Sequence, residues 1–434
     1  MKPIAFLPAP CLLALMSCGA LAASDDEVER SFDPYRNGFP TAPGVVTGVV
    51  VRKDNLDAFR EVLDPGLAMA VGRGWYELRV GPTTRMPMPS GYVEATRRNP
   101  GKARLGSRVG DIEGYVAGRP FIEEPDVKDA RAGEKLAWNF RYGAGFGEST
   151  TVYPFYWRYR DMKSGTVERT LKFSAHALKF KHRYGEPAPD LPGNTANLYL
   201  SIYLKALEPQ DLKNTQLLIQ RYDDDHKLDD AFMSLGVQRR VRRLATGQTT
   251  DAFLGSDVMI EDFEGYNGRI SEMKWTFRGA RNILMPYFAH AEMKPAEDLP
   301  PEADGYRFIA FTGQGNCFPD ITWQLRKTYV LEAEPVTPNH PVSKRVFYMD
   351  AQSMHINLGL IYDRKGELWK IAMLAKSHPD HHLPENKGAG GPVDDAFASI
   401  DVQAMHCTTG QFKTRVDAKT NQPALFQVQN MRGE

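Results

Sequence analysis

His378, His381 and His382 lie around Asp380, and neutral imidazoles beside a carboxylate are typical zinc ligands. The group falls in a stretch rich in proline and glycine that runs to Pro392, without the spacing of a helix or strand. We interpret it as a solvated loop and predict neither a metal site nor a cofactor.

A second polar group is acidic and could bind calcium. Its carboxylates come from Asp223, Asp224, Asp225, Asp229 and Asp230. The spacing lacks the glycine and the terminal glutamate of an EF-hand loop. We therefore predict an exposed turn.

Four arginines surround Val241: Arg239, Arg240, Arg242 and Arg243. On a strand they would divide between two faces, and they could bind a lipid phosphate by bidentate hydrogen bonds. Because a half-buried arginine needs a partner, we favour ion pairs with carboxylates that follow within one hairpin. These carboxylates are Asp257, Glu261 and Asp262.

Motifs of hydrolytic enzymes are missing from the sequence. It contains no G-x-S-x-G and no H-E-x-x-H. Cys407 directly follows His406, and adjacent residues of a strand point to opposite faces. Gly143, Gly145 and Gly147 precede no helical pattern, so they do not form a phosphate loop. We predict no enzyme, although 54 acidic residues leave a carboxylate pair open.

The overall composition is that of a globular protein without a charge bias. Lysine plus arginine and aspartate plus glutamate both number 54, so no global field would attract nucleic acid. The aromatic share of 11% suits strands better than helices.

The first 22 residues have the pattern of a signal peptide. Lys2 precedes an apolar run over residues 4–16 that is too short to span a bilayer, and Ala20-Leu21-Ala22 is an A-x-A cleavage site. We predict export to the periplasm. The alternative is an outer-membrane lipoprotein, because Leu15-Met16-Ser17-Cys18 resembles a lipobox with Cys18 as the lipidated residue. Met16 fits the lipobox poorly, which favours cleavage after Ala22 at the A-x-A site.

Two cysteines, Cys317 and Cys407, remain after the predicted cut. An oxidising compartment would allow them to form a disulfide, but two isolated cysteines leave open whether they do.

The chain after residue 160 has the pattern of strands. Leu198, Leu200, Ile202 and Leu204 recur with a period of two. Further strands are predicted at TYVLEA from Thr328, RVFYMD from Arg345, INLGLIYD from Ile356, ELWKIAML from Glu367 and ASIDVQAMH from Ala398. Strands joined by short polar turns pair antiparallel. Weak helix patterns occur at 209–218 and around Asn282.

The pattern divides the mature chain near residue 160. Residues 23–160 are predicted to be an irregular extension packed on the sheet, with one short helix capped by Asp54 or Asn55 and ended by Pro65-Gly66. Residues 106–147 have no sustained period. Residues 161–415 form the β domain, and 416–434 a flexible tail.

The predicted fold class is mainly β (α+β), with a large antiparallel sheet curled into a half-open barrel under a few helices. An open curled sheet with an apolar side forms a trough that suits acyl chains or sterols. The pattern leaves a solid core open as the alternative. Strand placement selects six aromatic residues as cavity candidates: Tyr199, Tyr203, Trp275, Phe277, Trp323 and Trp369.

A family resemblance rests on the segment FLGSDVMIEDF, from Phe253 to Phe263. With Gly255, Asp257 and Asp262 it resembles the G-S/T-D-x-x-x-x-D signature of bacterial outer-membrane lipoprotein-sorting-like proteins. QRRVRRL precedes it, and RKTYVLEA, KRVFYMDAQS and YDRKGELWKI follow in the family's order. DPGLAMAV, GYVAGRPF and AWNF are similar to a long periplasmic branch of uncharacterised function. The likeness covers residues 45–412.

The resemblance implies a half-open barrel closed by helices, similar to the periplasmic lipoprotein carrier. It also implies partners: an inner-membrane efflux-type transporter and an outer-membrane protein that handles lipids. In this family the motif residues and the arginines would be structural. Our hypothesis is a periplasmic carrier of lipids or other apolar molecules. The alternatives are an adaptor subunit without a ligand and an envelope hydrolase.

Overall fold

The computed structural model describes residues 24–145, 147–236, 240–244, 249–416 and 420–431. Within these residues sixteen strands form one large sheet, so the predicted mainly-β fold is confirmed. The predicted signal peptide, with Cys18, lies outside the described residues, as does Arg239. Within the described part of the chain, no helix is both long and apolar enough to cross a membrane.

The main path of the sheet is antiparallel, and its order is β11-β15-β16-β17-β18-β19-β20-β5-β6-β7-β8-β9-β10. The first six strands in this order are β11 (Met273–Met285), β15 (Thr322–Pro335), β16 (Val342–Asp350), β17 (Ile356–Asp363), β18 (Leu368–Ser377) and β19 (Val393–Asp401). The others are β20 (His406–Val416), β5 (Ser149–Asp161), β6 (Val167–Lys179), β7 (Leu198–Glu208), β8 (Gln216–Tyr222), β9 (Asp230–Leu235) and β10 (Arg240–Arg243). Short strands β1 (Val50–Val51), β2 (Leu78–Val80) and β12 (Tyr287–Phe288) extend it.

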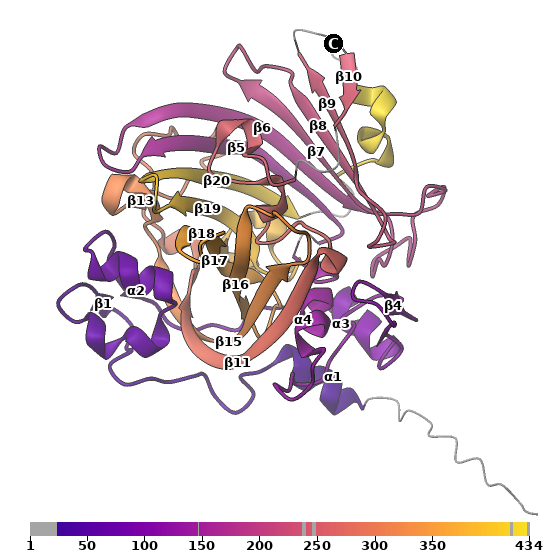
Figure 1. Ribbon diagram of the computed structural model, residues 1–434, viewed down its shortest axis with the longest axis horizontal. Helices are drawn as coiled ribbons and strands as arrows, with labels where there is room; N and C mark the ends of the chain where they lie inside the picture. Colours follow the sequence, from indigo (N-terminus) through magenta and orange to yellow (C-terminus); the bar gives the residue numbers. More distant parts are fainter. Residues whose placement is uncertain (1–23, 146, 237–239, 245–248, 417–419, 432–434) are drawn as a thin grey trace, which may run out of the picture.

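The chain connection between β10 and β11 determines how the interior is filled. These two strands follow each other in sequence, yet they lie at opposite ends of the sheet order. Residues 249–272, here called the crossing connection, lie between these strands in sequence and therefore pass across one face of the curled sheet. Figure 1 shows the sheet bending from β10 at the top to the arc of β11 and β15 at the bottom. The sheet is open, as predicted.

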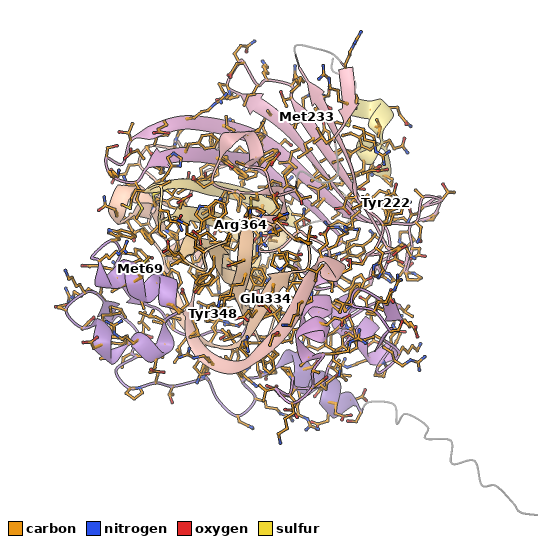
Figure 2. All side chains as sticks on the ribbon, in the orientation of Figure 1. Met69, Tyr222, Met233, Glu334, Tyr348 and Arg364 are labelled. Atoms are coloured by element: carbon orange, nitrogen blue, oxygen red, sulfur yellow. A yellow bond between two sulfur atoms is a disulfide. The ribbon has the colours of Figure 1, made fainter. Side chains whose placement is uncertain are left out.

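The face that the crossing connection covers is called the inner face, and it bears Phe155, Trp157, Phe397 and Phe412. On it these rings pack against Phe253 and against apolar neighbours in the connection. Figure 2 shows that side chains occupy much of the space that the strands enclose. The predicted trough therefore exists as a face, but the chain itself fills most of it.

The opposite face of the sheet packs against residues 51–86 of the N-terminal region. Helix α2 (Pro65–Gly72) begins where Asp64 accepts hydrogen bonds from the backbone N–H groups of Gly66 and Leu67. The sequence predicted a helix ending at Pro65, and this was wrong. Proline at the first helical position lacks an N–H that the helix would leave unpaired, so Pro65 starts the helix. The preceding residues form two 3-10 turns, at 56–58 and 60–62.

Three further helices lie at the lower right in Figure 1, beside the arc of β11 and β15: α1 (Asp25–Phe32), α3 (Ser90–Arg98) and α4 (Ala132–Arg141). Helix α4 buries Leu136 and Trp138 against the sheet. The prediction of irregular structure over 106–147 was thus partly wrong. A ten-residue helix without a side-chain N-cap gives little local signal. The weak helices at 209–218 and Asn282 were also wrong, because these residues lie in a turn with β8 and in β11.

The predicted boundaries near residues 160 and 416 need correction. β5 ends at Asp161 and pairs with β20 and β6, so the supposed extension contributes a central strand. Residues 423–426 and 428–431 form 3-10 turns, and Phe426 and Met431 are buried beside Leu218. The described part of the C-terminal segment is therefore packed on the sheet by these apolar side chains.

Candidate ligand-binding site

The crossing connection is attached to the inner face by polar contacts. Asp257 accepts hydrogen bonds from the Thr408 hydroxyl at 2.7 Å and from His406 Nδ1 at 2.7 Å, while Lys370 donates to its carbonyl at 2.6 Å. The hydrogen bond from His406 to Asp257 raises the pKa of His406 to about 9. At neutral pH this histidine is thus a cation that holds the connection on β20.

A buried ion cluster holds the middle of the connection. The guanidinium of Arg345 on β16 is fully buried and contacts both Glu261 and Asp262, the latter at 3.0 Å. Burial alone would raise the pKa of Glu261, but the contacts with Arg345 and His340 together outweigh it and lower that pKa. The cluster fixes the connection on β16, close to the β11 end of the sheet.

Between the connection and the inner face lies a cavity of about 110 Å³. Most of its lining is apolar, with Val258 and Phe263 on the connection side. The sheet supplies Phe155, Trp157, Ala175, Leu204, Leu374, Phe397 and Phe412. An apolar protein cavity of roughly 150 Å³ accepts benzene. This space, called the apolar cavity, can therefore hold a short apolar group.

One end of the apolar cavity is polar. Lys376 is buried between Asp394, with which it forms an ion pair, and Glu264, whose carboxylate lies 3.7 Å away. The Glu264 side chain is 27% exposed. Burial and the negative charge of Asp394 raise the pKa of Glu264 to about 8. This shift favours the protonated form of Glu264, while Lys376 and Asp394 form the ion pair.

Comparison with known proteins identifies the family. Residues 50–432 match the family described as "Protein of unknown function (DUF1329)". The chain belongs to this family. The membership predicted from the order of the motifs, in a domain of unknown function, is thereby confirmed.

Individual relatives of this DUF1329 protein are distant. The uncharacterized protein PA3922 of Pseudomonas aeruginosa is 23% identical over 384 residues, which are 84% of this chain and 76% of PA3922. A solved DUF1329 family protein from Desulfovibrio piger has 16% identity and a TM-score of 0.47, and it covers 71% of this chain and 100% of its own. A putative outer membrane lipoprotein-sorting protein domain from Vibrio parahaemolyticus has 14% identity and a TM-score of 0.47, covering 70% and 100%.

The six predicted cavity aromatics lie elsewhere in this DUF1329 chain. None of them lines the apolar cavity, although Tyr199 lines a second, smaller cavity beside it. Trp275 and Phe277 pack around Tyr266 and Tyr329, and Trp323 donates to the Tyr76 hydroxyl on the opposite face. Tyr203 donates a hydrogen bond to Gln216, and Trp369 donates one to Asp401. Tyr199 donates to the carbonyl of Arg141. The prediction placed them by strand pattern alone, which does not say which face a connection covers.

The lining residues that sequence reasoning missed carried a partial signal. Val258 and Phe263 lie inside the quoted motif segment and were not considered as lining. Phe155 and Trp157 lie in β5, which was assigned to the extension. Lys376, Asp394 and Glu264 come from separate elements, and no spacing in the sequence joins them.

For Arg243 the predicted pairing was wrong. Arg243 forms its ion pair with Asp230 on the neighbouring strand β9. Asp257 instead contacts His406, and Glu261 and Asp262 contact Arg345. The physical reason is topological: β10 is the last strand of the sheet, and the connection turns away from it. The exposed side chain of Arg240 lies on that same strand. Gly255 has a φ of +77°, in the left-handed region, which allows the turn before Asp257.

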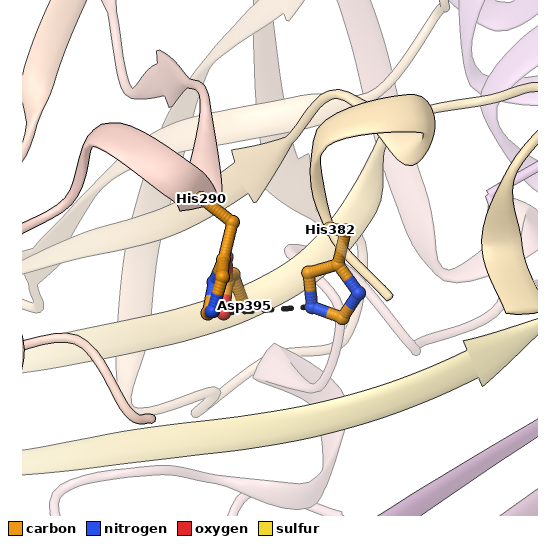
Figure 3. A group of neighbouring side chains, drawn as sticks. All are labelled: His290, His382 and Asp395. Atoms are coloured by element: carbon orange, nitrogen blue, oxygen red, sulfur yellow. Dashed lines mark hydrogen bonds and ion pairs between the residues drawn. The ribbon is translucent and has the colours of Figure 1, made fainter. Parts of the chain in front are cut away.

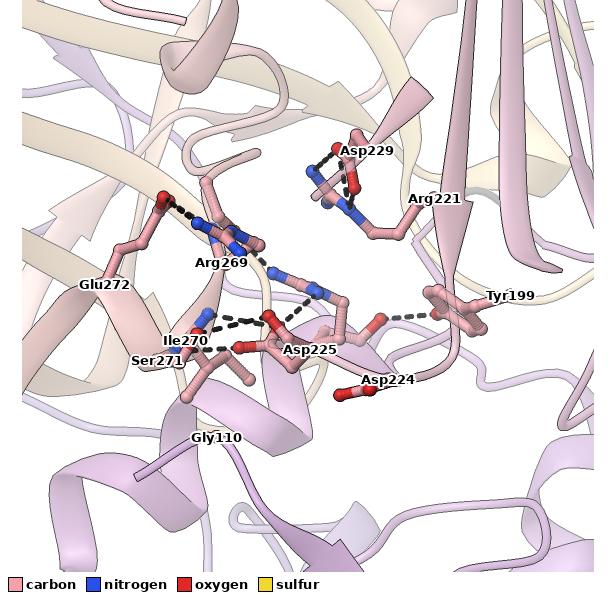
Figure 4. Close-up of polar contacts among 12 residues, drawn as sticks. Gly110, Tyr199, Arg221, Asp224, Asp225, Asp229, Arg269, Ile270, Ser271 and Glu272 are labelled. Atoms are coloured by element: carbon pink, nitrogen blue, oxygen red, sulfur yellow. Dashed lines mark hydrogen bonds and ion pairs between the residues drawn. The ribbon is translucent and has the colours of Figure 1, made fainter. Parts of the chain in front are cut away.

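The acidic group 223–230 is occupied by cationic and backbone partners. Asp225 is buried and accepts from Arg141 of α4 at 3.1 Å and from the backbone N–H of Ser271 at 2.7 Å. Figure 4 shows Asp225 beside Ser271. Asp223 accepts from Lys181 and His182, and Asp229 from Arg221. The prediction of an exposed turn thus needs correction for Asp225. This carboxylate joins α4 to the end of the connection.

The histidine loop contributes one member to a different cluster. Figure 3 shows His382, His290 and Asp395 side by side. Their potential metal-ligand atoms lie within 4.8 Å of one another. His290 Nδ1 lies 2.7 Å from Asp395. His378 and His381 remain on the 3-10 turn at 379–381. His290 and Asp395 were missed because they are distant in sequence from His382.

The hydrogen bonds around His382 favour a ring that binds no metal over a ring that serves as a metal ligand. Asn386 Oδ1 accepts from the backbone N–H of Val416, so its Nδ2 faces His382 Nδ1 at 3.0 Å. His382 Nδ1 is therefore an acceptor, and the ring proton lies on Nε2, toward Asp395 and the Tyr306 hydroxyl. A metal on Nε2 would move that proton to Nδ1, against the amide N–H₂. We interpret the cluster of His290, His382 and Asp395 as polar contacts that hold the loops together.

Ser174, His176 and Asn421 have the hydrogen bonds of a nucleophile, a base and an orienting group. Ser174 Oγ lies 2.7 Å from His176 Nε2, and His176 Nδ1 lies 2.8 Å from Asn421 Oδ1. Acyl transfer also needs N–H donors for the oxyanion. Phe173 and Ala175, which flank Ser174, are paired with β7 and β5. We interpret the hydrogen bonds among Ser174, His176 and Asn421 as contacts that hold the C-terminal segment on the sheet.

Cys317 and Cys407 form a disulfide that joins β20 to the chain before β15. Cys407 is buried in the cluster that contains α2, on the face opposite the apolar cavity. The bond therefore stabilises the sheet and takes no part in the candidate site.

Proposed function

We propose that this DUF1329 protein is a carrier of apolar molecules in the periplasm. The observation that supports it is the apolar cavity, which is lined by aromatic rings and lies beneath a connection rather than between regular elements. Ligand sites in proteins are mostly concave and apolar with a few polar groups, and Glu264 and Asp394 supply such groups here.

The volume of the cavity limits what the closed structure can hold. Burial of one methylene contributes about 0.8 kcal/mol, so a chain of several carbons would gain useful affinity. A longer chain needs more than the present space of about 110 Å³. Binding of such a chain therefore requires displacement of Phe263 and its neighbours, and we propose that the crossing connection moves to admit it.

The test is extraction of the protein from a native envelope, followed by mass spectrometry of co-purified small molecules. The proposal predicts an apolar compound in wild type and its loss in Ala175→Phe, which fills the cavity. Ala280→Phe, at an exposed position on β11, is the matched control and should keep the compound. A ligand-free wild-type protein that also binds no added acyl probe would contradict the carrier and favour an adaptor subunit.

A further inference from the structure

A second cavity adjoins the apolar one. It has a volume of about 60 Å³ and lies between the end of α4, β6, β7 and the start of β17. Both cavities are lined by Phe263 and Glu264, so these two residues form the partition between them. This second space is called the His355 cavity, after the residue that characterises it.

His355 is buried without a partner for its ring. Its exposed fraction is 3%, and neither Nδ1 nor Nε2 has a hydrogen-bond partner among the described residues. Backbone on one side restricts the ring, since a Cβ built on Gly145 would lie 2.7 Å from Nε2. An imidazole that is buried without hydrogen bonds costs free energy, so this ring is suited to a polar group of a ligand.

The charges around His355 are positive. Lys179 and Lys376 both line the cavity with it. Burial lowers the pKa of His355, and the positive charges of Lys376, Lys179 and Arg119 lower it further. Lys376 is neutralised by Asp394, whereas the ammonium of Lys179 donates to the carbonyl of Gly143 at 2.7 Å. The nearby carboxylate of Glu148 is paired with Arg183 at 3.0 Å.

We propose that the His355 cavity binds the carboxylate of a single-chain amphiphile, a fatty acid, whose hydrocarbon chain lies in the apolar cavity. His355 donates an N–H to one carboxylate oxygen, and Lys179 supplies the opposite charge. The proposal deepens the proposed function and rests on it. The cavity of about 60 Å³ has the size for a carboxylate, while a phosphodiester with its glycerol is larger.

The experiment is titration calorimetry of the purified protein with decanoate and with 1-decanol, which has the same chain and an uncharged head. Charged hydrogen bonds stabilise more than neutral ones, so we expect wild type to bind decanoate about tenfold more tightly than decanol. In His355→Leu that ratio should fall to about one while decanol affinity is kept. Lys179→Met should act in the same direction, and the exposed His381→Leu should change neither affinity.

The outcomes separate the two proposals. If wild type binds neither compound, the carrier function itself fails. If wild type binds both with equal affinity, the carrier function stands and the carboxylate site is contradicted, with the His355 cavity holding water only. Because the ratio of decanoate to decanol affinity is measured in the wild-type protein, the test decides between the proposals even if a variant does not fold.

Discussion

Trp157 on β5 and Phe263 in the crossing connection form an edge-to-face pair with ring centroids 6.1 Å apart. Edge-to-face pairs of this kind contribute about 0.5–1.5 kcal/mol beyond their buried area. The pair also borders the apolar cavity from both sides. The same contact therefore stabilises the closed connection and limits the space for a ligand.

Phe263→Ala should have opposite effects on stability and binding. Removal of the ring loses buried apolar area, and we expect a loss of about 2–3 kcal/mol in the free energy of unfolding. The enlarged cavity should bind decanol several-fold more tightly. Urea unfolding and calorimetry measure the two effects. Phe318→Ala, in the core on the opposite face, should destabilise without a gain in affinity; an equal gain there would contradict the account.

Arg345→Met should destabilise the protein strongly. The change leaves Glu261 and Asp262 buried without their cation, which costs about 3–5 kcal/mol in comparable cases. Urea denaturation measures the loss. Arg364→Met removes an exposed arginine and should stay within about 0.5 kcal/mol of wild type. Similar losses in both variants would show that the ion cluster does not anchor the connection.

His406 should make stability depend on pH in the alkaline range. Its pKa in the folded protein, about 9, lies above its unfolded value of 6.5, mainly because of Asp257. The folded state thus binds the proton more tightly, and the stabilisation is complete below pH 6.5 and lost as pH rises through 9. In His406→Asn the midpoint of urea unfolding should vary less with pH between 6.5 and 9 than in wild type. An unchanged profile would rule out this role.

Ser174 should not act as a nucleophile. A fluorophosphonate probe should leave the protein unlabelled, and Ser174→Ala should label no differently. Asn421→Ala should expose the C-terminal segment to proteolysis, since Asn421 donates to Ser149 and to the carbonyls of Thr150 and Ala177. Stoichiometric labelling at Ser174 would instead support the hydrolase alternative.

The local sequence pattern predicted the strands well, but it predicted their order in the sheet less well. The alternation of Leu198, Leu200, Ile202 and Leu204 predicted β7, because a period of two reflects only the pleat of a strand. The pairing of β5 with β20 joins residues more than 200 positions apart, and no local pattern encodes it. The course of residues 249–272 across the inner face depends on this order of the strands.

The candidate site was harder to predict for the same reason. Phe253 and Asp257 were noticed in a motif, yet their contacts with the inner face depend on the sheet order. The six aromatics chosen as cavity candidates are on strands, as expected, but they pack against helices, loops and other strands. The sequence shows the residues that line the cavity, but it does not show on which face of the sheet each of them lies.

The most direct test of the central claim is quenching of Trp157 fluorescence by a decanoic acid brominated at its chain end. Bromine quenches at contact, so a chain in the apolar cavity should quench a saturable part of the emission. Trp157→Phe should lose that part, while Trp369→Phe, a tryptophan outside the cavity, should keep it. Saturable quenching that is identical in wild type and Trp157→Phe would show that the chain binds elsewhere and contradict the account.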